Sequence, residues 1–269
     1  MLEYLATNLE MTVESIELFG LVLVRVGTLV FILPFLGIQN ATPTVAKAGL
    51  SFFIALLVFP MLKPVSFVIH NSTPFFMVLV LEQVMVGLII GFTFTFMFHF
   101  VKMGGYLISR DIGIMMGGTI DPIQEENTAY FGVLVLLILS MVFLMRGNHH
   151  YLLKSIFDSF EMIPLGQFSW EWRPMAQVLT LMSASAILTG VKLAGPIMIT
   201  LLLTSIGMAL IARVMPQMNV WIVSIPIKVT LGCLAMWQVF PLMADFFEMN
   251  FHEVQEAIKI VMQAGGVSG

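Results

Sequence analysis

The chain has 269 residues, of which 59% are hydrophobic and 10% are charged, with a mean hydropathy of +0.98. Soluble globular domains carry about 25% charged residues, so a chain this apolar belongs in a membrane or in an assembly that excludes water. The net charge of −4 is spread thinly and forms no basic patch, which gives no reason to expect nucleic acid as a partner.

The N-terminal part, residues 1–103, predicts helical hairpins. After an amphipathic lead-in, a first apolar run covers residues 16–36. A second run, residues 48–62, is shorter than the roughly 20 residues that span a bilayer. A third run, residues 75–101, is long enough for a helix that is apolar all round.

A glycine-rich stretch follows the third run. Residues 103–122 contain five glycines and three methionines and end in Asp121-Pro122. Glycine permits unusual backbone angles, and Asp-Pro would stop a helix. We therefore expect residues 104–122 to form a loop, and we interpret this loop as the working part of the protein.

The remaining chain predicts further helices. Residues 123–174 read as two middle helices, and residues 175–250 as a long helical hairpin whose arms contain Pro196 and Pro226. Residues 251–269 form an amphipathic tail. The expected fold is all-α and membrane-associated, with long hairpins, several of them kinked at proline or glycine.

Four charged side chains lie inside apolar runs: Arg25, Glu82, Lys192 and Lys228. A charge at the centre of a lipid-facing helix costs at least about 2.5–3.5 kcal/mol, so it is tolerated where it faces protein or water. The alternative is that a long side chain extends from near a helix end to the membrane surface. Both interpretations stay open for Lys192 and Lys228.

No combination of residues favours catalysis. His149 and His150 are adjacent, so they point to different faces of a helix and make a poor metal site. Glu125-Glu126 is explained by the start of a helix, where the helix dipole favours acidic residues. The sequence therefore predicts no catalytic residue, no metal, no cofactor and no enzyme.

Several motifs resemble those of the FliR/SctT family, the export-gate subunits of flagellar and type III secretion systems. They are residues 25–34 (Arg-Val-Gly-Thr-Leu-Val-Phe-Ile-Leu-Pro), 147–153 (Gly-Asn-His-His-Tyr-Leu-Leu), 212–219 (Ala-Arg-Val-Met-Pro-Gln-Met-Asn) and 225–228 (Ile-Pro-Ile-Lys). The central stretch is similar with one departure, since Ile112-Gly113 stands where the family tends to have Met-Gly before the Asp-Pro.

The resemblance implies one FliR-like export-gate domain over residues 1–269, present in one copy per complex. The expected partners are FliP-like, FliQ-like and FlhB-like subunits, membrane lipid and unfolded export substrates in transit. These subunits would form a helical cone of hairpins in the bacterial inner membrane, at the flagellar basal body. The central loop would act as a plug across the conduit.

The candidate functional residues fall into two groups. The plug group consists of Arg110, Asp111, Ile112, Gly113, Ile114, Met115, Met116, Gly117, Gly118, Asp121 and Pro122. The buried-charge and assembly group consists of Arg25, Glu82, Lys192, Arg213, Gln217, Asn219 and Lys228.

Three alternatives compete with a flagellar export-gate subunit. The first is a stand-alone secondary transporter with helices broken at Pro196 and Pro226. The second is an export-gate subunit of a virulence injectisome. The third is a membrane enzyme, which the lack of a catalytic constellation disfavours.

Overall fold

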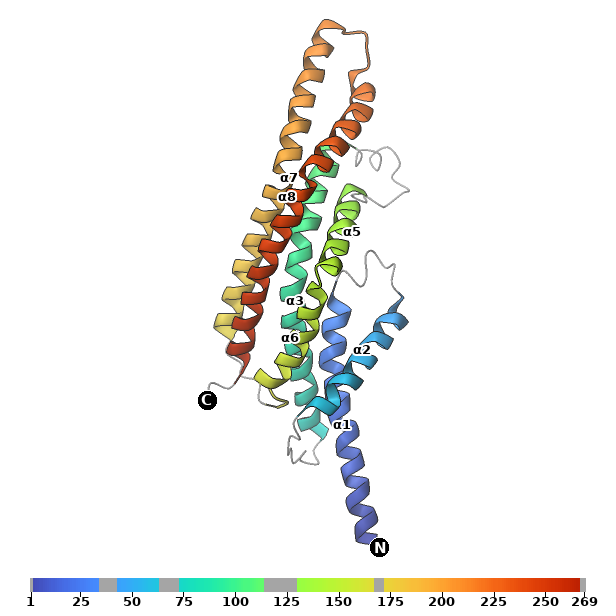
Figure 1. Ribbon diagram of the computed structural model, residues 1–269, viewed down its shortest axis with the longest axis vertical. Helices are drawn as coiled ribbons and strands as arrows, with labels where there is room; N and C mark the ends of the chain where they lie inside the picture. The colour runs from blue at the N-terminus through green and yellow to red at the C-terminus, as the bar shows by residue number, and fades with distance from the viewer. Residues whose placement is uncertain (1, 34–42, 63–72, 114–129, 167–171, 267–269) are drawn as a thin grey trace. The chain divides into compact units, whose positions relative to one another are not determined.

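The structure is a computed structural model that describes residues 2–33, 43–62, 73–113, 130–166 and 172–266 (Figure 1). Within these ranges the chain is helical and has no β-strand, which confirms the predicted all-α fold. The helices are α1 (Leu2–Ile32), α2 (Thr44–Val58), the short 3-10 helix η3 (Phe59–Met61), α3 (Thr73–Ile112), α5 (Tyr130–Met145), α6 (Asn148–Met162), α7 (Trp172–Val214) and α8 (Val220–Gly265).

Glycine and proline mark several helix ends. Pro43 directly precedes α2, and Pro60 lies in the first turn of η3, where its missing N–H is tolerated. Gly147 separates α5 from α6 and has a φ of 73°, a left-handed conformation that suits glycine better than other residues. The predicted turn between the two arms of the long hairpin falls between α7 and α8, as expected.

Prolines inside α7 and α8 do not end these helices. Pro196 lies within α7, and Pro226 and Pro241 lie within α8. Each proline removes one backbone hydrogen bond, but the helix continues on both sides. The transporter alternative expected helices broken at Pro196 and Pro226, and it loses this feature because α7 and α8 continue through both prolines.

The chain divides into two compact units. The first comprises residues 1–95, 147–180 and 254–269, and the second comprises residues 96–146 and 181–253. Helices α3, α7 and α8 contribute residues to both units.

In the first unit, aromatic and glycine contacts hold α1 to its neighbours. The ring of Phe19 meets the rings of Phe52 and Phe59 edge-on, with 5.7 Å between centroids in each pair. A Cβ added at Gly87 of α3 would lie 2.6 Å from the backbone oxygen of Arg25 on α1. Only glycine therefore fits where α3 crosses α1.

In the second unit, a cluster of phenylalanines joins three helices. Phe98 of α3, Phe143 of α5 and Phe247 of α8 have ring centroids 5.7, 6.1 and 6.4 Å apart in the three pairs. Phe251 adds a fourth ring, 5.8 Å from Phe143. All four are almost fully buried, and such edge-to-face pairs stabilise by about 0.5–1.5 kcal/mol each beyond the burial of area.

Hydroxyl side chains inside the apolar helices bond to their own helix. Thr95, Ser109 and Ser140 each donate to the backbone oxygen four residues earlier, at 2.7 to 2.8 Å. A buried hydroxyl without a partner is costly in an apolar medium. These local bonds satisfy the hydroxyl groups of polar residues inside the apolar helices.

Five of the described helices are long and apolar enough to cross a membrane, and six candidates result if α5 and α6 count as one broken span. The five segments are Ser15–Ile32, Thr44–Met61, Pro74–Ile112, Met175–Val214 and Val220–Gly265. The membrane association predicted from composition is confirmed at the level of helix length and hydropathy.

Candidate functional site

A buried arginine organises the first unit. Arg25 of α1 is only 1% exposed. Its Nε donates to Oε1 of Gln83 on α3 at 2.7 Å, and its Nη1 donates to the backbone oxygens of Ser159 and Ile163 at 2.9 and 3.0 Å. The guanidinium carbon also lies 4.2 Å from the ring centroid of Phe160. One side chain therefore fastens three helices together.

The end of α6 explains why a cation fits at this point. The last carbonyl groups of a helix have no partner within the helix, and the helix dipole makes them more negative. Ser159 lies in the last turn of α6, and Ile163 follows its end. The planar guanidinium can donate to both oxygens at once, which a lysine amine does less well.

Glu82, one residue before Gln83, holds the turn that follows α6. Its Oε1 accepts hydrogen bonds from the backbone N–H of Gly166 at 3.0 Å and from Nε2 of Gln83 at 3.4 Å. Gly166 has a φ of 75°, which favours glycine. The structure thus brings two predicted buried charges, Arg25 and Glu82, to the two sides of one turn.

The end of α3 carries the described part of the predicted plug group. Ile112 is the last residue of α3 and is fully buried. Gly113 follows with a φ of 88° and donates from its N–H to the backbone oxygen of Arg110 at 3.1 Å, which ends the helix. Lys228 of α8 donates from Nζ to the backbone oxygen of Asp111 at 3.3 Å. The remaining plug residues, Ile114 to Pro122, lie outside the described residues.

The predicted start of the loop is wrong. Residues 104–112 are helical and belong to α3. A Cβ at Gly104 would lie 2.9 Å from the backbone oxygen of Gly190 on α7, and a Cβ at Gly105 would overlap the backbone of Gly132 on α5. These glycines serve close helix crossings, whose packing offsets the roughly 1 kcal/mol that a glycine costs inside a helix.

The other predicted assembly residues lie on the surface of the second unit. Lys192 on α7 and Arg213, Gln217 and Asn219 at the hairpin turn are exposed in this chain. The side chain of Asn219 accepts a hydrogen bond from the N–H of Ile222 at 3.5 Å, an N-cap for α8. Lys192 and the turn residues Arg213, Gln217 and Asn219 do not form one site.

Several residues that take part in these contacts were not predicted from the sequence. Gln83 could have been found as a polar residue inside an apolar run. The backbone oxygens of Ser159 and Ile163 carry no sequence signal. Arg146, which bonds to Glu248 and lies 4.0 Å from Asp245, is also new, because its partners are about 100 residues away.

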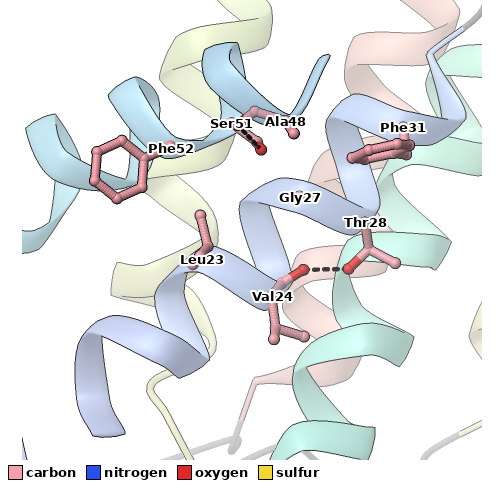
Figure 2. Close-up of a pocket in the computed structure, with 8 residues that line it drawn as sticks. All are labelled: Leu23, Val24, Gly27, Thr28, Phe31, Ala48, Ser51 and Phe52. Atoms are coloured by element: carbon pink, nitrogen blue, oxygen red, sulfur yellow. Dashed lines mark hydrogen bonds between the residues drawn. The ribbon is translucent and has the colours of Figure 1, made fainter. Parts of the chain in front are cut away.

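A groove lies between α1 and α2, and Figure 2 shows the residues that line it. Its volume is about 540 Å³, and most of its wall is apolar. The hydroxyl groups of Thr28 and Ser51 point at backbone oxygens of their own helices, those of Val24 and Ala48. The residues that line the groove include no carboxylate, histidine, lysine or cysteine. Within the described ranges, no group of three His, Cys, Asp or Glu side chains could hold a metal ion.

These features define a helical membrane protein whose polar side chains join helices to one another. The sequence profile of the bacterial export proteins, family 1, matches residues 16–254, and the chain therefore belongs to this family. This result confirms the family expected from the motifs, and it makes the chain a subunit of an export apparatus.

Named relatives extend over most of the chain. The chain is 26% identical to the flagellar biosynthetic protein FliR of Escherichia coli strain K12 over 249 residues, which cover 91% of this chain and 92% of that protein. It is 23% identical to the FliR protein of Bacillus subtilis strain 168 over 256 residues, covering 93% and 97%. It is 27% identical to the Yop proteins translocation protein T of Yersinia pestis over 225 residues, covering 80% and 83%.

Proposed function

We propose that the chain is a structural and gating subunit of the protein-export channel of a flagellar type III secretion system. Membership of the bacterial export proteins supports the role in export. The relatives named flagellar biosynthetic proteins, from Escherichia coli and Bacillus subtilis, support the flagellar assignment. The similarity to a Yop translocation protein keeps an injectisome as the second candidate.

One observation supports the proposal that the chain is a subunit of a complex rather than a solitary protein. In the second unit, α7 exposes apolar side chains from residue 181 to residue 214. Nine of them are more than half exposed: Leu181, Ile187, Leu188, Ile199, Leu202, Leu203, Ile206, Leu210 and Val214. At 1.5 Å per residue this apolar face is about 50 Å long, whereas the hydrocarbon core of a bilayer is about 30 Å thick.

Tilting α7 in the membrane does not bring the length of its apolar face down to the thickness of the hydrocarbon core. At a tilt of about 40°, the upper end of the range for membrane helices, the face would still project about 38 Å along the bilayer normal. The part outside the hydrocarbon needs another protein surface, because large exposed apolar patches are not stable in water. The neighbouring arm, residues 220–253 of α8, has the same character, with Ile222, Leu234, Trp237 and Met249 more than half exposed.

The proposed partners are FliP-like, FliQ-like and FlhB-like subunits, in a complex in the bacterial inner membrane that contains one copy of this chain. The hairpins of several subunits would cover one another's apolar faces and form a conduit for unfolded substrates. The chain would contribute no catalysis. The segment that begins after α3 would act as a plug, and the buried Ile112 and the capped end of α3 would give that segment a fixed starting point.

A pull-down from membranes tests this function. The tagged chain is extracted in mild detergent, and the proteins that remain bound are identified by mass spectrometry. We expect small apolar hairpin proteins of the export apparatus in stable complex with the chain. A stable, solitary chain that transports a small solute in vesicles would overturn the proposal and favour a secondary transporter.

A further inference from the structure

One line of residues along α7 has the spacing of a helix–helix contact. Leu188, Lys192, Gly195, Ile199, Leu202 and Ile206 follow one another at steps of four, three, four, three and four residues. This alternation places them on one side of a helix, as in the seam of a coiled coil. The four aliphatic members are each more than half exposed, so within the described residues no helix of this chain covers the line. We call these six residues the α7 seam.

The glycine in the seam leaves room for a close neighbour. A Cβ added at Gly195 would meet no atom within 4 Å, in contrast to Gly190 one turn earlier, where a Cβ would lie 2.8 Å from the backbone oxygen of Phe100. Gly190 is therefore already used for a contact inside the chain, and Gly195 is not. Small residues on membrane helices let the backbones of two helices approach closely.

Lys192 gives the seam a charge. Its side chain is exposed, and it forms no ion pair or hydrogen bond with any residue that the structure describes. Of the described acidic groups in the second unit, Asp245 and Glu248 lie at Arg146, Asp111 lies 3.7 Å from Arg110, and the exposed Glu253 forms no ion pair with Lys192. A lysine inside an apolar run is tolerated when it faces protein or water, and it is most stable beside an opposite charge.

We propose that the α7 seam binds an apolar helix of another export-apparatus subunit, and that this helix places an aspartate or glutamate against Lys192. The apolar seam residues would provide the contact area and Gly195 the close approach. The charge pair would fix the register, since a shift by one turn would leave both charges without a partner. This inference rests on the proposed function, because it identifies the chemistry of one partner surface.

Site-specific photocrosslinking in the full export complex tests the proposal. A benzoylphenylalanine is placed at Leu188 or at Ile199, on either side of Lys192, and the crosslinked peptides are sequenced by mass spectrometry. We expect a peptide from an apolar helix that contains an aspartate or glutamate. Adducts with lipid alone, or with a helix that lacks acidic residues, would overturn the proposal.

Two charge variants complete the test. Lys192→Glu should lower the crosslink yield at Ile199 about tenfold or more, because it places two carboxylates together, whereas Lys192→Arg should stay within about twofold of the parent chain. Crosslinks from Trp237, an exposed position on α8 outside the seam, should keep their yield in both variants. An unchanged yield at Ile199 in Lys192→Glu would also overturn the proposal.

The two proposals fail in different ways. If the seam contacts only lipid while the chain still co-purifies with export subunits, the inference on Lys192 is wrong and the proposed function stands. If the chain purifies alone, the proposed function is wrong before the seam is considered.

Discussion

The amine of Lys228 on α8 donates a hydrogen bond to the backbone oxygen of Asp111 in the last turn of α3, with an Nζ–O distance of 3.3 Å. A cation at this place compensates the negative end of the α3 dipole and occupies a carbonyl that has no partner within the helix. Ile112, the next residue, packs against Gly232 of α8, where a Cβ would lie 3.1 Å from its Cδ1. These two contacts fix the point from which the chain leaves α3.

Replacing Lys228 should loosen the end of α3. We expect Lys228→Met to speed amide hydrogen exchange at residues 110–113 by about fivefold to thirtyfold, which corresponds to about 1–2 kcal/mol. Lys259→Met, at an exposed lysine elsewhere on α8, is the matched control and should leave this exchange unchanged. Equal exchange rates in the Lys228→Met variant and the parent chain would show that the contact does not hold the helix end.

The reversal Lys228→Glu should have a larger effect. A carboxylate would face the carbonyl oxygens at the end of α3, so we expect reduced recovery of the complex in a pull-down. Recovery equal to that of the parent chain would contradict this prediction.

Removing Arg25 should destabilise the first unit strongly. Arg25→Met deletes three buried hydrogen bonds and the contact with Phe160, and it leaves the amide oxygen of Gln83 without its donor. Hydrogen bonds to charged groups contribute about 1.5–3 kcal/mol each, and breaking a buried charge network costs about 3–5 kcal/mol. We expect a clear fall in the melting temperature of the purified complex.

Two variants separate this network from a general loss of charge. Arg25→Lys keeps the charge but not the planar fork, and it should recover only part of the stability. Lys154→Met removes an exposed charge on α6 and should change the melting temperature little. A melting temperature for Arg25→Met as high as that of Lys154→Met would refute the role of the network.

The close crossing of α3 and α7 should not accept a methyl group. In Gly190→Ala the new Cβ would lie 2.8 Å from the backbone oxygen of Phe100 and 3.2 Å from Cβ of Met103. The helices must separate, and overpacking of this kind costs about 1–3 kcal/mol. At Gly27 of α1 an added Cβ meets nothing within 4 Å, so Gly27→Ala should be neutral or stabilising through its helix propensity.

Thermal unfolding of the two alanine variants measures this difference. A Gly190→Ala variant as stable as Gly27→Ala would mean that the crossing is not as close as the structure shows.

Arg146 should couple to Glu248 across the second unit. The two side chains form an ion pair next to the end of α5, and both are partly exposed. Partly exposed pairs contribute about 0.2–1 kcal/mol, so each of Arg146→Gln and Glu248→Gln should have a small effect on stability. A double-mutant cycle measures the coupling, and a coupling energy of zero would exclude a functional ion pair. The exchanged pair Arg146→Glu with Glu248→Arg should restore part of the stability.

Deleting residues 113–119 tests the proposed plug. Complex assembly should persist, because the helices that contact one another are unchanged. The membrane of cells that express the deletion should become permeable to small solutes, which a fluorescent-dye uptake assay measures. A membrane as tight as that of the parent strain would contradict a sealing role for this segment.

The sequence determined the class of structure because composition and hydrophobic periodicity can be read from residues that are close together along the chain. Apolar runs, prolines and turn residues predicted the helices, and the predicted turn near Pro216 falls between α7 and α8, but α8 continues to Gly265 through residues that were predicted as a separate tail. The family motifs led to the correct family, since they consist of residues at fixed short spacings.

The tertiary structure decided what the glycines and the buried charges do. Gly104 and Gly105 predicted a loop because glycine weakens a helix, but their partners Gly190 and Gly132 make them crossing points of helices. Arg25 and Glu82 stood out as charges in apolar runs, yet their partners at the end of α6 and in the turn that follows it are backbone groups more than 80 residues away. Backbone atoms are the same in every residue, so no sequence pattern could have identified these partners; only the folded chain brings them within hydrogen-bond distance.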